Sequence, residues 1–364
     1  MRSGAQTAPR EQPAGTPVDP TPATRSSRQA SQARLIWRRF ARGRLNVVAL
    51  GVVVLFALLA LFADFLAADM PIVLHLDGET HVLPNLASTS SRPTELRRLD
   101  PEGLWEEMDP DDWALFPLVR RGPNDVDLLA RLESPSSRHW LGTDAIGRDV
   151  LARIVHGTRI SLSVGVIAVG LYVLIGIVLG ALAGFYGGKI DLVVSRLIEV
   201  KMVFPTFFLI LTIMGIVERP TIWHLMVVIG FTGWPGVARL IRGEILRVRE
   251  LDYVAAIRAL GGSDARIVLR HVIPNSIAPV FVAATFGLAG AILTESALSF
   301  LGFGTPPPTA SWGELLTQAY EHAVTSGAWW LTVFPGAALF LTVTSFNLVG
   351  EGLRDALDPR LPSK

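Results

Sequence analysis

The chain has 364 residues and a formal net charge of +1, and 50% of its residues are hydrophobic. The near-neutral charge gives no reason to expect a nucleic acid or a strongly acidic partner. The absence of cysteine excludes a disulfide framework and any thiolate metal site or nucleophile. The apolar residues lie in long runs, and a run of about 18 or more is long enough to cross a bilayer. We therefore expect an all-α, polytopic membrane protein.

The first residues of the chain differ in composition from the rest of the sequence. Residues 1–33 are rich in Pro, Ala, Thr, Ser and Gln and contain no apolar segment, so they do not read as a signal peptide. Such a segment cannot bury enough apolar surface to offset its chain entropy, and we expect a disordered cytoplasmic tail. Residues 34–66 supply an amphipathic lead and the first span, whose apolar run starts at Asn46. The arginines that precede this run predict a cytoplasmic N-terminus: Arg34, Arg38, Arg39, Arg42 and Arg44.

A long polar stretch, residues 67–159, comes after the first span. Long loops cross the membrane regardless of their charge, so a cytoplasmic N-terminus predicts that this stretch is a periplasmic insert. Its aromatic side chains favour a small folded cap, and a loosely ordered loop is the alternative for its middle part. These aromatic residues are Trp105, Trp113, Phe116 and Trp140.

The remaining apolar runs predict five further spans, at residues 160–184, 190–217, 222–240, 274–298 and 330–349. Pro205 interrupts the third span and is expected to bend it, because proline removes one backbone hydrogen bond. Trp329 and Trp330 are expected to anchor the last span at the membrane interface. The count gives six transmembrane helices, a permease core at residues 160–353, a cytoplasmic tail at residues 354–364, and both termini on the cytoplasmic side.

Residues 241–273 connect the fourth and fifth spans, and their many arginines predict a cytoplasmic loop. Within the loop, Asp252 is expected to cap a short helix. The apolar residues that share or border one face of this helix, at i, i+4 and i+7 spacing, are Tyr253, Val254, Ile257 and Leu260. The pattern predicts an amphipathic helix at the membrane surface.

A sharp turn is expected after this helix. Gly261 and Gly262 end it, as glycine does at a left-handed C-cap. Ser263 or Asp264 can cap a second short helix, which runs to Pro274 at the start of the fifth span. A helical hairpin of this kind either docks a partner protein or lies flat on the membrane surface.

The hairpin resembles the EAA loop of ABC importer permeases, whose pattern is Glu-Ala-Ala, three residues, Gly, nine residues, Ile-any-Leu-Pro. Ala256, Gly261 and Pro274 match this pattern. The departures are Ala255 at the Glu position, Ile257 at the second Ala, and His271 and Ile273 at the Ile and Leu positions. The resemblance implies an ATPase-docking surface that lacks one ion pair. The residues it assigns to this surface are Asp252, Tyr253, Ala255, Ala256, Ile257, Arg258, Leu260, Gly261, Gly262 and Pro274.

Three longer segments resemble the dipeptide, oligopeptide and nickel permease family. They are HWLGTDAIGRDVLARIVHGTRISLSVG, TESALSFLGFGTPPPTASWGELL and FNLVGEGLRDALDPRLP, and the likeness covers residues 140–362. They are similar to the second, C-type permease subunit of a type I importer. The long insert with ADMPIVLHLDG resembles the oligopeptide branch of the family.

The resemblance implies a heteromeric importer in the bacterial inner membrane that carries di- or oligopeptides, or alternatively nickel or another small solute. It implies a homologous second permease, two ATPases that bind ATP and magnesium, and a periplasmic binding protein. This chain would then be no enzyme and would hold no cofactor or metal of its own. A secondary transporter is a competing class, but it usually shows inverted repeats with matching broken helices, and none is visible in this sequence.

Charged residues near or within the spans are the remaining candidates. Glu295 lies late in the fifth span, near the outer interface, where hydration or a hydrogen bond is the simpler explanation and a place in the substrate path is the alternative. Pro205 and Glu199, which precedes it, are further candidate pore or gate residues, and a structural role is the alternative for Glu199. Asp144, Arg148 and Asp149 lie in GTDAIGRD, and their alternating charge predicts an ion-pair network at the outer mouth, with a direct substrate contact as the alternative.

Overall fold

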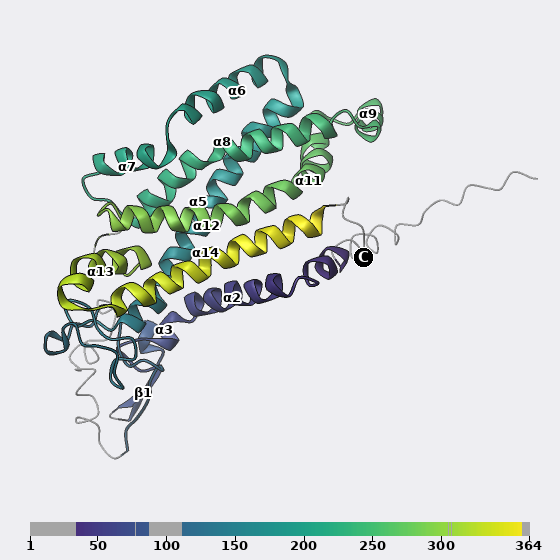
Figure 1. Cartoon of the computed structure of the whole chain (residues 1–364). Coiled ribbons are helices and arrows are strands. Elements are labelled where there is room, and N and C mark those ends of the chain that lie inside the picture. Colours follow the sequence, from purple (N-terminus) through teal and green to yellow (C-terminus); the bar gives the residue numbers. More distant parts are fainter. Residues whose placement is uncertain (1–33, 77, 87–110, 305, 307, 359–364) are drawn as a thin grey trace, which may run out of the picture.

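The computed structural model describes residues 34–76, 78–86, 111–304, 306 and 308–358. The predicted tail at residues 1–33 and Trp105 lie outside these residues. Within them, five helices are long and apolar enough to span a membrane, and the number rises to six if a bent helix pair is counted as one span. These elements are α2 (Arg44–Leu61), α5 (Val150–Tyr186), the pair α6 (Gly188–Val203) and α7 (Thr206–Ile216), α8 (Ile222–Val248), α12 (Ala278–Phe300) and α14 (Trp330–Leu357). Figure 1 shows α2, α14, α12 and α8 side by side, and the prediction of a polytopic helical membrane protein is confirmed, with five to six candidate spans.

The third span is broken rather than gently bent. Helices α6 and α7 meet at an angle of 80°. Phe204 between them is extended, with φ −85° and ψ 124°, because the ring of the following Pro205 disfavours a helical conformation there. Two other prolines lie inside α8 and α14 without ending them, Pro235 and Pro335. The break at Pro205 therefore depends on the residues around it as well as on the proline.

Three glycines on α5 allow close packing against α8. A Cβ atom on Gly176 would lie 2.6 Å from Val237, one on Gly180 would lie 2.3 Å from Ile241, and one on Gly184 would lie 2.9 Å from the carbonyl oxygen of Arg242. Glycines spaced by four residues share one helix face, and in a membrane such close backbone approach drives helix association. Helices α5 and α8 thus form a tightly packed pair.

Helix α5 begins at Val150, well before the predicted start at residue 160. The side chain of Asp149 accepts a hydrogen bond from the backbone N–H of Ala152 and so caps the helix. In the sequence, the polar side chains in the first turns of α5 favour assigning these residues to the insert. These side chains are nevertheless bonded to other elements: His156 contacts the carbonyl oxygen of Ala67 at 2.7 Å, and Arg159 donates to that of Ala60 at 2.8 Å.

The insert contains a small antiparallel sheet, so the all-α expectation is corrected for this part of the chain. The strand order is β2-β1-β3, with β1 at Val73–Leu76, β2 at Glu79–Val82 and β3 at Trp113–Leu115. Two buried residues, Met70 and Leu74, pack with Phe116 beneath it. Trp113 and Trp140 are exposed, so of the three predicted cap aromatics that the structure describes, Phe116 alone joins this cluster. Short helical segments complete the region: α3 (Ala63–Leu66), η1 (Pro84–Leu86) and η2 (Leu128–Ala130).

An additional helix, α13 (Trp312–Ser326), covers the bundle beside the insert (Figure 1). Its start lies in a Pro-rich segment whose composition favours a loop. Ser311 accepts a hydrogen bond from the backbone N–H of Glu314 and starts the helix, and this Ser-x-x-Glu pattern was a signal for it in the sequence. Trp330 is buried nearby and donates to the carbonyl oxygen of Thr143, so the prediction that it anchors at the membrane interface is wrong.

The two ends of the bundle carry different features, and we name them by these features. The insert end holds residues 67–76, 78–86 and 111–149 together with α13. The hairpin end holds the short elements α9 (Asp252–Ala259), α10 (Asp264–Ile267), η3 (Val268–Val272) and α11 (Ile273–Ser276). The described chain also starts and finishes at the hairpin end, where Arg39 donates to the carbonyl oxygen of Asp358 at 3.2 Å.

Candidate functional site

The hairpin at residues 252–274 is the candidate functional site, and its first helix protrudes from the bundle (Figure 1). Helix α9 starts at Asp252, but the N-cap position is occupied by Leu251 and no side chain caps the helix. The prediction that Asp252 caps it is therefore wrong. Asp252 lies in the first turn instead, where a negative charge interacts favourably with the helix dipole.

The turn after α9 is the glycine turn that the sequence predicts. Gly261 has φ +78°, its N–H donates to the carbonyl oxygen of Arg258, and the N–H of Gly262 donates to that of Ile257, both at 3.0 Å. This pair of bonds is the Schellman motif, which satisfies the last carbonyl groups of a helix. A Cβ atom on Gly262 would lie 2.8 Å from Ile257, whereas one on Gly261 would point into open space. Gly261 is therefore needed for its backbone conformation and Gly262 for close packing.

The predicted apolar face of α9 is divided between the bundle and the exterior. Val254 is fully buried and Ile257 packs partly against the same core cluster. Leu260 is 87% exposed, and Tyr253 is also exposed. Val254 and Ile257 therefore hold the helix against the bundle, and part of the predicted apolar face is not available to a partner or to the membrane surface. The outward surface consists of Tyr253, Ala255, Ala256, Arg258 and Leu260, with Gly261 at its edge.

The second helical segment contains a widened turn. Residues Val268–Val272 are π-helical, and the N–H of Ile273 donates to the carbonyl oxygen of Val268. Pro274 follows directly and has no N–H to donate, so the wider turn accommodates its ring. Pro274 lies in α11 and the fifth span starts only at Ala278, so the predicted start of that span is corrected.

The three candidate pore or gate residues lie in different surroundings. Glu199 is exposed at the surface of α6 and pairs with Arg196 at 2.5 Å, and Pro205 forms the break between α6 and α7. Glu295 is fully buried, so the expectation of hydration is wrong, whereas the expected hydrogen bonding is present. The hydroxyl groups that donate to its carboxylate are those of Ser161 at 3.3 Å, Ser296 at 3.3 Å and Ser299 at 2.9 Å.

The structure contains the predicted ion-pair network at the insert end. Arg148 pairs with Asp144 at 2.7 Å. Arg153 pairs with Glu314 of α13 at 2.5 Å and lies 3.7 Å from Asp144. The charge pattern of the sequence predicts the first pair only, because Arg153 and Glu314 are distant in sequence and meet only where α13 folds over α5. Asp149 belongs to a separate contact, 3.0 Å from the buried His139.

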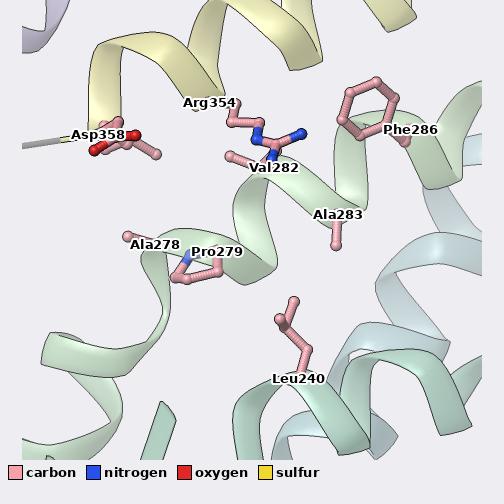
Figure 2. Close-up of a pocket in the computed structure, with 9 residues that line it drawn as sticks. Leu240, Ala278, Pro279, Val282, Ala283, Phe286, Arg354 and Asp358 are labelled. Atoms are coloured by element: carbon pink, nitrogen blue, oxygen red, sulfur yellow. The ribbon is translucent and has the colours of Figure 1, made fainter. Parts of the chain in front are cut away.

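A cavity of about 510 Å³ opens at the hairpin end between α8, α12 and α14 (Figure 2). Its walls are mostly apolar, and Leu240 and Ala283 face each other across it, with Arg354 reaching in from α14. Glu199, Pro205 and Glu295 do not line this cavity. The cavity therefore gives no evidence that these three residues line a substrate path.

The fold and the site together define a polytopic membrane protein that presents a glycine-capped helix from a short connection between two spans. Residues 176–362 match the family described as binding-protein-dependent transport system inner membrane component. Residues 31–77 match the N-terminal transmembrane domain of oligopeptide transport permease C. The chain belongs to the binding-protein-dependent transport system inner membrane component family, which is a family of ABC importer permeases.

Relatives in other bacteria carry related names. The dipeptide transport system permease protein DppC of Alkalihalophilus pseudofirmus is 40% identical over 233 residues, which is 64% of this chain and 76% of that protein. The glutathione transport system permease protein GsiD of Pectobacterium atrosepticum is 39% identical over 251 residues, 69% of this chain and 82% of that protein. Among solved structures, a chain of the MetNI methionine ABC transporter in an inward-facing form aligns with a TM-score of 0.45 and 17% identity, over 57% of this chain and 98% of that one.

Proposed function

We propose that this chain is one permease subunit of an ATP-driven peptide importer and that the hairpin at residues 252–274 is its contact with an ATPase. The observation that carries the proposal is α9 itself. One side of the helix is fixed to the bundle through Val254, and the other side presents Tyr253, Ala255 and Leu260 outward. A helix held in this way can transmit a push or a pull from a docked protein to the spans behind it.

The importer would contain a homologous second permease, two ATPases and a substrate-binding protein. The family description names transport that depends on a binding protein, and the extended likeness to peptide permeases supports this composition. ATP and magnesium would bind to the ATPases. Closure of the ATPases around ATP would move the docked hairpins and open the path toward the binding protein.

Peptides are the proposed cargo, because the relatives are named for dipeptide and glutathione transport. Nickel or another small solute, the alternative considered from the sequence, has no matching relative among those described above. The proposed site is the bacterial inner membrane. The N-terminus, the hairpin and the C-terminus would face the cytoplasm, since the arginine-rich segments gather at the hairpin end and positive charge stays inside.

The decisive experiment replaces Gly261 with Trp in the complete importer. The residue has φ +78° and is exposed, so a bulky side chain would strain the turn, by about 1–2 kcal/mol, and project from the docking surface. We expect the ATPases to dissociate during purification, or peptide uptake to fall at least about tenfold for each ATP hydrolysed. Both are measured on the importer reconstituted in liposomes, with a labelled peptide and a phosphate-release assay.

Gly302→Trp is the matched control. Gly302 has φ +82° and the same open surroundings, but it lies at the end of α12 toward the insert. The control should keep the ATPases bound. If Gly261→Trp retained wild-type uptake and ATPase association, the docking role of the hairpin would be refuted.

A further inference from the structure

Both ends of α9 are tied to one place, the last residues of α5. Arg249, just before α9, donates from Nη1 to the carbonyl oxygen of Gly184 at 2.8 Å and to that of Phe185 at 3.3 Å. Arg258, in the last turn of α9, lies over the ring of Phe185, with its Cζ atom 5.6 Å from the ring centroid. One arginine before α9 and one in its last turn therefore contact the same residue pair, Gly184 and Phe185.

The end of α5 is suited to receive an arginine. The last carbonyl groups of a helix have no intrahelical donor, and they carry the negative end of the helix dipole. Helix α5 ends at Tyr186. The C-cap residue Gly187, with a φ of +66°, turns the chain away toward α6. Arg249 thus supplies a charged donor to the carbonyl groups that this turn leaves open, and Gly184 and Phe185 are themselves buried.

Helix α5 connects this attachment to the rest of the bundle. Its glycine face is packed directly against α8, so its hairpin end cannot shift alone. It has 37 residues, which corresponds to about 55 Å at 1.5 Å per residue. At the insert end, Arg153 of the same helix is fixed to Glu314 of α13. A displacement at the hairpin would therefore reach the insert end through one continuous helix.

We propose that Arg249 and Arg258 are positioning residues that fasten the α9 hairpin to the C-terminal end of α5. Movement of the hairpin is then delivered to α5 and is not absorbed by bending of the chain at residues 249–251. The assignment rests on the proposed function, because it presumes that an ATPase moves the hairpin. Arg249 is the better residue to test, since Arg258 is also part of the outward docking surface.

The first experiment measures coupling in the reconstituted importer. Arg249→Met removes the donor but keeps an apolar stem, and Arg249→Lys restores a charged donor. Arg247→Met is the control, because Arg247 is exposed and pairs with Glu244 on its own helix. We expect Arg249→Met to lower the labelled peptide transported per ATP hydrolysed about tenfold, with the ATPases still bound, and Arg249→Lys to recover most of it.

The second experiment observes the attachment in the full chain alone. The sequence has no cysteine, so Leu260→Cys and Lys189→Cys, both at exposed positions, introduce a unique pair of cysteines. Each cysteine is then labelled with a nitroxide spin label. The distance distribution between them should be narrow in the otherwise unchanged chain, stay narrow with Arg247→Met, and broaden with Arg249→Met.

Equal behaviour of Arg249→Met and Arg247→Met in both measurements would overturn the assignment. This result is distinct from failure of the proposed function. If the proposed function failed, the unchanged importer would neither retain ATPases nor move peptide. The label distances in the chain alone would still show whether Arg249 holds the hairpin.

Discussion

Buried ion pairs lie at the insert end of the molecule, whereas ion pairs within α6 and within the hairpin are exposed. Arg153 and Glu314 pair at 2.5 Å with side chains that are 0% and 12% exposed. Arg196 and Glu199, on α6, pair at the same distance with side chains that are 70% and 56% exposed. Pairs of equal geometry therefore lie in very different environments within one chain.

The difference matters because the environment decides what an ion pair contributes. Removing one partner of a buried pair leaves an unpaired buried charge and costs about 3–5 kcal/mol. Exposed pairs contribute about 0–1 kcal/mol, since water and salt screen them. The buried pairs thus hold the insert end in one arrangement, whereas exposed pairs such as Arg196–Glu199 on α6 and Arg258–Asp264 in the hairpin can exchange partners at little cost. That freedom suits a surface that docks another protein.

The largest effect should come from Arg153→Met. The substitution removes the close partner of Glu314 and leaves its charge with the more distant Arg148, at 3.8 Å, so we expect a loss of up to about 3–5 kcal/mol in the free energy of unfolding. The measurement is denaturant or thermal unfolding of the full chain in detergent. Adding Glu314→Leu to the same chain should restore part of the loss, because the stranded charge is then removed as well. A single variant as stable as the unchanged chain would mean that the network contributes no stability.

Glu295→Ala should give an intermediate effect. It leaves the hydroxyl groups of Ser161 and Ser299 without their buried acceptor, so we expect a loss of about 2–3 kcal/mol. Glu351→Ala is the control, since Glu351 is an exposed carboxylate on α14. The same unfolding assay compares the two. Equal stability of the two variants would contradict the view that Glu295 joins α5 to α12 in the interior.

The sequence was sufficient for the features that depend on local pattern. Long apolar runs predicted the spans because crossing a bilayer requires them. The glycine turn at Gly261 was also predictable, because a left-handed residue after a helix has few alternatives. The start of α5 and the whole of α13 were missed because their polar side chains are satisfied by distant partners, such as Glu314 for Arg153.

The candidate site shows the same division. That α9 forms, and where it ends, follows from its own residues. That Val254 is buried and Leu260 is not depends on where the end of α5 lies in space, which no local pattern encodes. Arg249 cannot be singled out from the sequence for the same reason. It is one arginine among several, and only the fold brings it to the carbonyl oxygen of Gly184.

The smallest effect should come from Arg196→Ala. Arg196 and Glu199 lie one helical turn apart on an exposed face, and such pairs contribute a few tenths of a kcal/mol. We expect the free energy of unfolding to change by less than about 0.5 kcal/mol, and raising the salt concentration to remove the remaining difference. A loss comparable to that of Arg153→Met would show that this face of α6 is enclosed in the chain itself. The contrast between the buried pairs of the insert end and the exposed pair on α6 would then fail.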